Sequence, residues 1–157
     1  MTDQIYTYFT IEIIFLWFNL GILPFWLILV FFPKSQICKV FITSIFPFII
    51  LSFVYGYLIY VLFEEGYDFT ANFELYLGLD AVSNLFTDKS FIILFWLHFL
   101  AINLFCGGWI VKDSQKFGIN KILMSFPLLI TYFIGPIGLT IYWIIRIFYA
   151  KRINLYD

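Results

Sequence analysis

Four long apolar stretches dominate the hydrophobic pattern of the chain. They run from about residue 7 to 32, 40 to 63, 91 to 111 and 122 to 147, and short polar segments separate them. A helix that crosses a bilayer needs about 20 mostly apolar residues, so each stretch is long enough to span. The stretches lack the alternation of apolar and polar residues that marks membrane strands. The pattern predicts an all-α integral membrane protein, with four transmembrane helices in one membrane domain over residues 1–157.

The longest polar segment, residues 64–89, follows the second stretch and is rich in acidic residues. Within it, Leu75, Leu79, Val82 and Phe86 recur at helical spacing. This spacing predicts a short interfacial helix that lies on the membrane surface between the second and third spans. An ordinary solvated loop is the alternative interpretation.

The composition supports the membrane class and excludes others. The chain of 157 residues is 63% hydrophobic, 24% aromatic and only 12% charged, with a mean hydropathy of +0.97. Soluble domains average about 25% charged residues. The net charge of −1 provides no basic surface for nucleic acid. Cys38 and Cys106 match no metal-binding spacing, so we expect free thiols, no metal and no cofactor.

Lysine and arginine in the loops indicate the orientation. Five basic residues lie in the loops after the first and third stretches, at positions 34, 39, 112, 116 and 121. Four spans would leave the other four, at positions 89, 146, 151 and 152, on the opposite side. The balance favours a non-cytoplasmic N-terminus and a non-cytoplasmic acidic loop, in a plasma, inner or photosynthetic membrane.

Polar residues inside the spans are candidates for a binding site, because polar groups in hydrocarbon usually face the interior of a helix bundle. Glu12, Asn19 and Trp26 lie on one stripe of the first span. The predicted ligand-contacting residues are Asn19, Trp26, Ser52, Trp96, Thr131 and Tyr142, with Asn103 beside them in the third span. The alternative is that these groups bond only to each other and hold the bundle together.

His98, the single histidine, has three possible roles. Imidazole carries protons near neutral pH, so His98 is a candidate proton carrier. It could instead bond to a carbonyl group and anchor its helix, or act as an axial ligand to a pigment metal. Its spacing from Asn103, five residues, corresponds to about 140° of rotation, so the two side chains do not stack but could line one wide face.

The stretch "WLHFLAINLFCGGWIVKDSQKFGI" resembles the signature of the abscisic-acid-deficient-four-like family of small four-helix membrane proteins. "FIGPIGLTIYWIIR" resembles the family's fourth helix, and "LPFWLILVFFP" resembles its first. The matching residues of the signature are Trp96, His98, Leu100, Ala101, Leu104, Phe105, Gly107, Asp113, Gly118 and Ile119. Two positions depart from the pattern: Asn103 stands where the family carries aspartate, and Gly108 where an arginine often follows.

The plant members of this family are neoxanthin synthases, so the resemblance implies a carotenoid-related function: binding or isomerisation of a xanthophyll or similar polyene lipid. It implies that His98 carries a proton and that Asn103 orients the substrate oxygen. An amide cannot exchange protons as a carboxylate does, so Asn103 leaves catalysis open. The alternative is a non-catalytic subunit or a pigment- or lipid-binding scaffold in a larger membrane complex or homo-oligomer. A transporter is a weaker option, because no repeat or charged pathway is visible.

Overall fold

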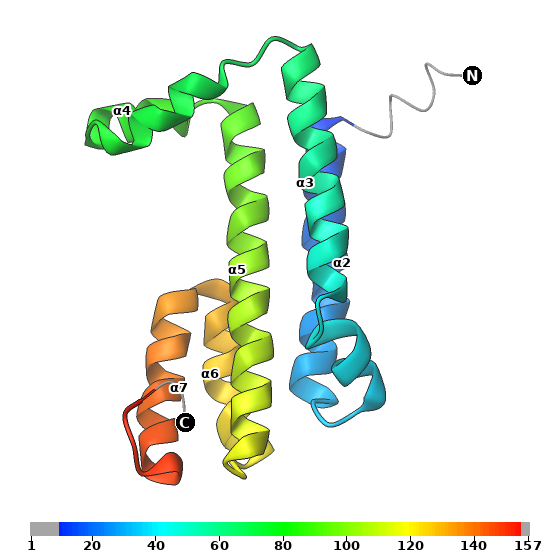
Figure 1. Cartoon of the computed structure of the whole chain (residues 1–157), viewed down its shortest axis with the longest axis vertical. Helices are drawn as coiled ribbons and strands as arrows, with labels where there is room; N and C mark the ends of the chain where they lie inside the picture. The colour runs from blue at the N-terminus through cyan, green and yellow to red at the C-terminus, as the bar shows by residue number, and fades with distance from the viewer. Residues whose placement is uncertain (1–9, 155–157) are drawn as a thin grey trace. The chain divides into compact units, whose positions relative to one another are not determined.

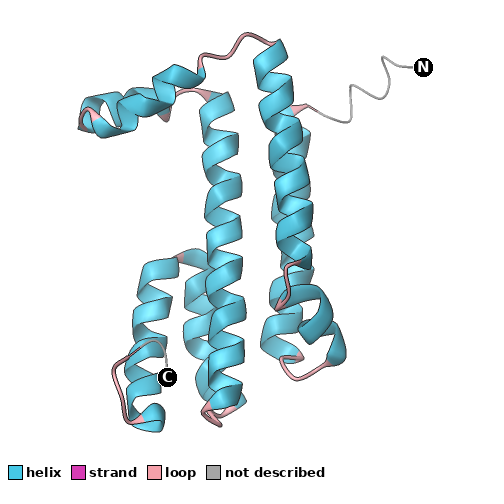
Figure 2. Cartoon of the chain, viewed as in Figure 1, coloured by secondary structure: helices cyan, strands magenta, loops and turns pink. Residues whose placement is uncertain are grey.

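The computed structural model describes residues 10–154, and the regular elements in that range are helices (Figures 1 and 2). The predicted all-α class is therefore confirmed for this part of the chain. Two compact units are distinguished, and each is described by itself. Unit 1 comprises Met1–Gly21 and Phe48–Leu100, and unit 2 comprises Ile22–Pro47 and Ala101–Asp157.

Three helical segments are long and apolar enough to cross a membrane: Ile11–Phe31, Cys38–Glu64 and Lys89–Lys116. They correspond to the first three predicted spans. α2 is Ile11–Phe31 and α5 is Lys89–Lys116. The prediction that the first span begins at residue 7 extends outside the described residues.

The second span is interrupted near its start. A π-helical turn, η1 (Cys38–Ile42), comes first, and α3 (Phe46–Glu64) begins after a break at residues 43–45. Pro47 is the second residue of α3, where its missing N–H removes no helical hydrogen bond. The Ser44 hydroxyl accepts a hydrogen bond from the Phe46 N–H at 3.1 Å. A capped start at residue 46 therefore replaces the uniform helix predicted from residue 40.

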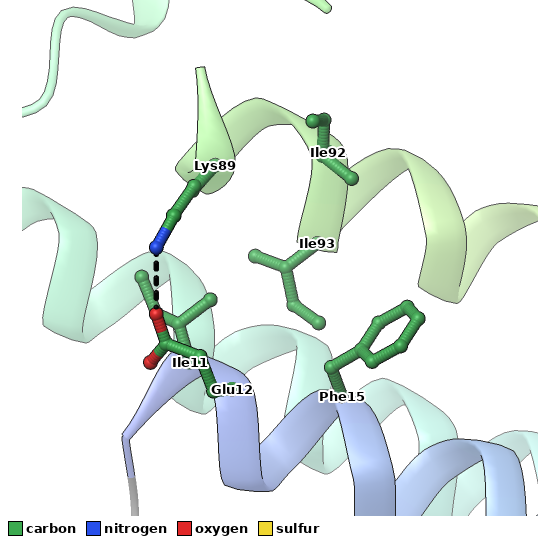
Figure 3. Close-up of a pocket in the computed structure, with 6 residues that line it drawn as sticks. All are labelled: Ile11, Glu12, Phe15, Lys89, Ile92 and Ile93. Carbon is green, nitrogen blue, oxygen red and sulfur yellow. Dashed lines mark hydrogen bonds and ion pairs between the residues drawn. The ribbon is translucent and has the colours of Figure 1, made fainter. Parts of the chain in front are cut away.

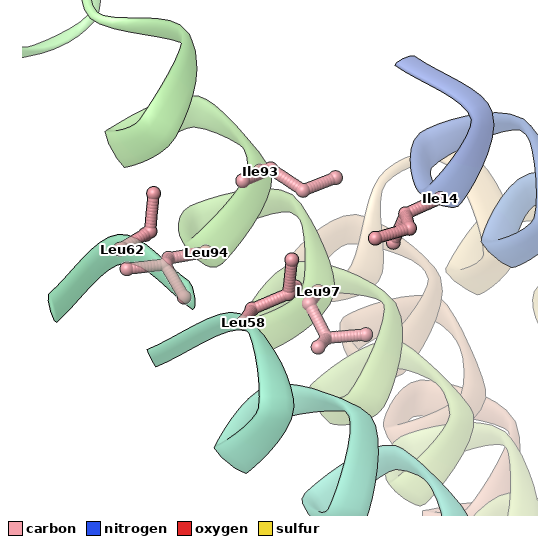
Figure 4. Close-up of a cluster of buried hydrophobic side chains, with 6 residues drawn as sticks. All are labelled: Ile14, Leu58, Leu62, Ile93, Leu94 and Leu97. Atoms are coloured by element: carbon pink, nitrogen blue, oxygen red, sulfur yellow. The ribbon is translucent and has the colours of Figure 1, made fainter. Parts of the chain in front are cut away.

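An apolar cluster holds the helices of unit 1 together. Its buried members are Ile14, Leu58, Leu62, Ile93, Leu94 and Leu97, from α2, α3 and α5 (Figure 4). Leu94 and Leu97 lie three residues apart on α5, and Leu58 and Leu62 lie four apart on α3, so each pair lies on one side of its helix. The cluster packs the first half of α5 against α3.

The acidic segment of unit 1 forms two short helices rather than one. η2 is a 3-10 helix over Phe69–Tyr76, and α4 is an α-helix over Leu79–Leu85. Gly78 separates them with a φ of 148°, a conformation that favours glycine. The segment is helical, as predicted, but Leu75 and Leu79 belong to different helices. The break at Gly78 therefore interrupts the predicted apolar stripe. Contact of this segment with the membrane surface stays a prediction.

The fourth apolar stretch is divided, so the predicted fourth span is not confirmed. It forms α6 (Lys121–Phe133) and α7 (Gly135–Ala150), and the helix stops at Ile134, whose φ and ψ are −138° and 80°. The two helices lie side by side and run in opposite directions (Figure 1). At about 1.5 Å per residue they are about 20 and 24 Å long, which is shorter than the roughly 30 Å hydrocarbon core.

Close backbone packing explains how α6 and α7 lie together as the α6–α7 hairpin. Gly138 of α7 lies on Thr131 of α6, and a Cβ atom at Gly138 would overlap both the backbone and the hydroxyl of Thr131. Thr131 and Gly138 are seven residues apart and would be separated by about 10 Å along the axis of one straight helix. Their contact therefore requires the reversal of the chain between them. Pro136, in the first turn of α7, has no N–H with which to continue the α6 hydrogen-bond ladder.

The α6–α7 hairpin also changes where the basic residues lie. In unit 2 the cations of Lys116, Arg146 and Arg152 all lie within 5.5 Å of the centre of the Phe117 ring. Arg146 and Arg152 therefore lie next to the end of α5 within unit 2. Unit 2 contains eight of the nine basic residues, at positions 34, 39, 112, 116, 121, 146, 151 and 152.

Candidate functional site

Two predicted ligand-contacting residues of unit 1 bond to each other. The Trp96 Nε1–H donates to Asn19 Oδ1 at 3.1 Å, and the Asn19 Nδ2–H donates to the carbonyl of Phe15 at 2.7 Å. The Phe15 ring also contacts Trp96, with 5.8 Å between centroids. Both donor groups are used inside the protein, so Asn19 and Trp96 join α2 to α5 within unit 1.

His98 and Ser52 lie at exposed positions of unit 1. The imidazole ring of His98 meets the Tyr55 ring edge-on, with 5.3 Å between centroids. The proton-carrier role of His98 and the ligand contact of Ser52 stay predictions, because the described geometry pairs neither with an acid or a base.

A small groove lies between the first turns of α2 and α5 in unit 1. Its apolar walls are Ile11, Phe15, Ile92 and Ile93, and it encloses about 190 Å³ (Figure 3). Glu12 and Lys89 form an ion pair of 2.9 Å at its edge. Their side chains are 65% and 76% exposed, so the pair contributes little to stability.

Asn103 is the most informative predicted site residue of unit 2. It is 4% exposed, and its Nδ2 has no hydrogen-bond partner within residues 10–154. Its Oδ1 lies against Gly135 at the start of α7, so closely that a Cβ atom at Gly135 would overlap it. The structure therefore brings a buried amide to the turn between α6 and α7, with a donor left for another group.

Trp26 is the second buried donor of unit 2 without a partner in the described range. The residue is 5% exposed, and its Nε1–H makes no hydrogen bond there. The far edge of its indole lies on Gly107, where a Cβ atom would be 2.8 Å from Cη2. Tyr132 of α6 meets the indole edge-on at 5.2 Å. The lack of a side chain at Gly107, one turn after Asn103, lets the indole approach α5.

Thr131 and Tyr142, also predicted as ligand contacts, use their hydroxyl hydrogens within unit 2. The Thr131 hydroxyl donates to the carbonyl of Pro127 at 2.8 Å. The Tyr142 hydroxyl donates to Asp113 Oδ2 at 2.7 Å, and Arg146 Nε donates to the same oxygen at 2.7 Å. Arg146 Nη1 also donates to the carbonyl of Asn154 at 3.0 Å.

This network of Asp113, Tyr142 and Arg146 is buried: Tyr142 is 0%, Arg146 1% and Asp113 9% exposed. Stacked Trp109 and Trp143 flank it, with their ring centres 5.6 Å apart. The network fastens α7 to the end of α5. This pairing was not among the sequence predictions, although an arginine inside an apolar segment, four residues after a tyrosine, indicates a buried partner.

Acidic, histidine and cysteine side chains do not gather in the described part of the chain: no three of them lie close enough to hold a metal ion. Cys38 and Cys106 are free thiols. Within residues 10–154, Asn103 Nδ2 and Trp26 Nε1 are buried side-chain atoms without a hydrogen-bond partner.

Comparison with known proteins places the chain in a family. The family model described as ABA DEFICIENT 4-like matches residues 13–142. This range contains α2 except its first two residues, all of α3, α5 and α6, and the first half of α7. The chain belongs to the ABA DEFICIENT 4-like family. This confirms the family resemblance read from the residues around His98 and Asn103.

Among members of the ABA DEFICIENT 4-like family, the chain is similar to "Protein ABA DEFICIENT 4, chloroplastic" of Arabidopsis thaliana. The two are 25% identical over 129 residues, which cover 80% of this chain. The match spans 57% of the plant protein, so the chain covers just over half of that relative's length. No solved structure matches the chain.

Proposed function

We propose that this protein binds a carotenoid or a similar polyene lipid within the membrane, with an oxygenated end of the ligand near Asn103 and Trp26. The observation that carries the proposal is the pair of buried N–H donors in unit 2 that have no partner within residues 10–154. Family membership supports the polyene as the ligand class.

The energetic cost of these donors supports a ligand. A buried donor without a hydrogen bond costs about 1–3 kcal/mol, and such groups are rare in native proteins. The surroundings are apolar or aromatic, as at Trp26, where Tyr132 and Gly107 contact the indole. An apolar ligand with one oxygen acceptor would satisfy a donor and keep the remaining contacts apolar.

Isomerisation of the bound polyene is the catalytic extension of this proposal. It would need an acid or a base at the reacting atoms, and His98 with Asn103 are the candidates from the family signature. Asn103 is an amide and His98 lies at an exposed position of unit 1, so we place binding before catalysis. A role as a pigment-binding subunit of a larger complex or of a homo-oligomer also requires the binding step.

The α6–α7 hairpin supports a specific orientation. Both helices are too short to cross, and we propose that the hairpin enters the membrane and returns to the side where α5 ends. Eight of the nine basic residues then share the cytoplasmic side, and Lys89 remains on the other side with the acidic loop. The N-terminus would be non-cytoplasmic, as the sequence predicted, and the C-terminus cytoplasmic.

Reporter fusions test the orientation. Alkaline phosphatase is active only outside the cytoplasm and green fluorescent protein folds in the cytoplasm, so each is fused after residue 157 and, separately, inserted after Glu74. Fluorescence at the C-terminus and phosphatase activity in the acidic loop are expected. Phosphatase activity at both positions would support four complete crossings instead.

Expression in a carotenoid-producing bacterial host tests binding. The protein is purified in detergent, and the bound pigment is extracted and compared between the wild type, Asn103→Leu and Trp26→Phe. Both variants should retain less pigment per protein. Thr140→Val, at an exposed position of α7, is the matched polar-to-apolar control and should retain the wild-type amount.

The same extract separates the alternatives. A pigment that is absent from the host alone would demonstrate isomerisation, whereas unaltered host pigment would indicate binding only. A colourless, correctly folded wild-type protein from such a host would contradict the proposal.

A further inference from the structure

The first turn of α7 presents backbone donors next to Asn103. The first N–H groups of a helix have no partner inside that helix. In α7, the ladder begins with the Gly138 N–H, which donates to the carbonyl of Ile134 at 3.1 Å. Gly135 and Ile137 precede it with their N–H groups outside the ladder, and Pro136 has none. This end of a helix of 16 residues also carries partial positive charge.

The buried amide of Asn103 provides an independent indication of a ligand at the same place. Its Oδ1 is in contact with Gly135, which holds the amide against the first turn of α7. Its Nδ2 lies 3.9 Å from the position that a Cβ atom at Gly135 would take, and has no partner within residues 10–154. Because the residue is 4% exposed, bulk water does not satisfy this donor.

We infer that the turn at Gly135 and the amide of Asn103 form a subsite for the end group of the polyene; this inference rests on the proposed function. The subsite selects a polyene with a carbonyl end group over one with a hydroxyl end group. A carbonyl oxygen accepts from Nδ2 and from a helix N-terminus and brings no hydrogen of its own. A hydroxyl group brings an O–H that also needs an acceptor. Asn103 Oδ1 is already packed against Gly135, and an O–H left unsatisfied in a buried place costs binding energy.

Asn103 determines this preference because an amide donates and an ionised carboxylate only accepts. Asn103→Asp keeps the size and shape of the side chain and, at a pH high enough to ionise the carboxyl group, removes the donor. Asn103→Leu keeps a branched side chain of similar shape and removes both polar atoms. The two variants separate the loss of a donor from a change in packing.

Three carotenoids with one carbon skeleton test the inference: canthaxanthin with ring ketones, zeaxanthin with ring hydroxyls and β-carotene with no oxygen. Each is added to the purified full-length protein in detergent, and the dissociation constant is measured from the absorption of the pigment retained with the protein. Canthaxanthin should bind about ten-fold more tightly than zeaxanthin, the effect of about one hydrogen bond.

In Asn103→Leu the three carotenoids should bind within about two-fold of one another, with β-carotene unchanged, and Asn103→Asp should likewise lose the preference for the ketone. Thr140→Val should keep it. Equal or tighter binding of zeaxanthin by the wild type, or a ketone preference that survives both variants, would overturn the inference and leave the proposed function intact. Failure of all three carotenoids to bind the folded wild type would overturn both.

Discussion

Replacement of Arg146 by methionine should strongly destabilise unit 2, because it leaves a buried carboxylate without its cation. Arg146 is 1% exposed and its Nε lies 2.7 Å from Asp113 Oδ2, with Asp113 9% exposed. Removal of one partner of a buried ion pair typically costs about 3–5 kcal/mol. The Tyr142 hydroxyl would remain as a hydrogen-bond donor to Asp113, but it is neutral.

The magnitude follows from burial, and an exposed ion pair of the same chain provides the control. Lys89 and Glu12 are 2.9 Å apart, close to the 2.7 Å of the buried pair, but their side chains are 76% and 65% exposed. Exposed pairs contribute about 0–1 kcal/mol. Lys89→Met should therefore cost less than about 1 kcal/mol, although it removes the same kind of charge pair.

Thermal unfolding in detergent, followed by tryptophan fluorescence, measures the difference. The Trp143 ring centre lies 5.3 Å from Cζ of Arg146, so part of the emission of the five tryptophans reports on the network. At roughly 2–4 °C per kcal/mol, the midpoint of Arg146→Met should fall by about 10 °C, and that of Lys89→Met by no more than about 4 °C. The double variant Asp113→Asn with Arg146→Met should recover most of the loss, because no charge remains buried.

Two outcomes would refute this reasoning. Arg146→Met with the stability of the wild type would mean that the pair contributes nothing as a buried contact. A double variant as unstable as Arg146→Met alone would mean that lost packing, and not the unpaired carboxylate, causes the destabilisation.

Two further predictions concern buried contacts of unit 2. Asn103→Leu should raise the unfolding free energy of the ligand-free protein by about 1 kcal/mol or more, because it removes a buried donor without a partner. The same variant should bind pigment more weakly. A lower unfolding free energy in a denaturant titration would contradict this prediction. Gly138→Ala should open the α6–α7 hairpin and lower the thermal midpoint, since its Cβ atom would overlap Thr131. Gly21→Ala, with nothing within 4 Å, is the control and should be neutral or slightly stabilising.

The long apolar runs made three of the four predicted spans readable from the sequence. α2 and α5 lie where hydropathy placed them, because a run of about 20 apolar residues has few alternatives to a spanning helix. The stretch from 122 to 147 is also mostly apolar, yet the chain reverses at Ile134. Hydropathy could not distinguish a kinked helix from a reversal of the chain. The close contact between Gly138 and Thr131 stabilises the reversal, and such a contact does not appear in a hydropathy pattern.

The polar residues show a similar division. The sequence predicted Asn19, Trp96 and Trp26 as ligand contacts and Asn103 as an orienting residue. In the structure the first two hydrogen-bond to each other, whereas the last two keep donors without partners in the described residues. Residue type and helical spacing indicate that a polar side chain faces the interior of the protein. They do not indicate which hydrogen-bond partner, if any, it has there.

By itself, the sequence determined the membrane class, the family and the positions of the long helices, because all three depend on residue type and local order along the chain. Only the tertiary structure decided that α7 turns back beside α6, that Arg146 neutralises Asp113 across 33 residues, and that the amide of Asn103 is left with a donor. These outcomes depend on pairing between distant segments, and the free energy of a polar group in an apolar interior is set by the partner that it meets.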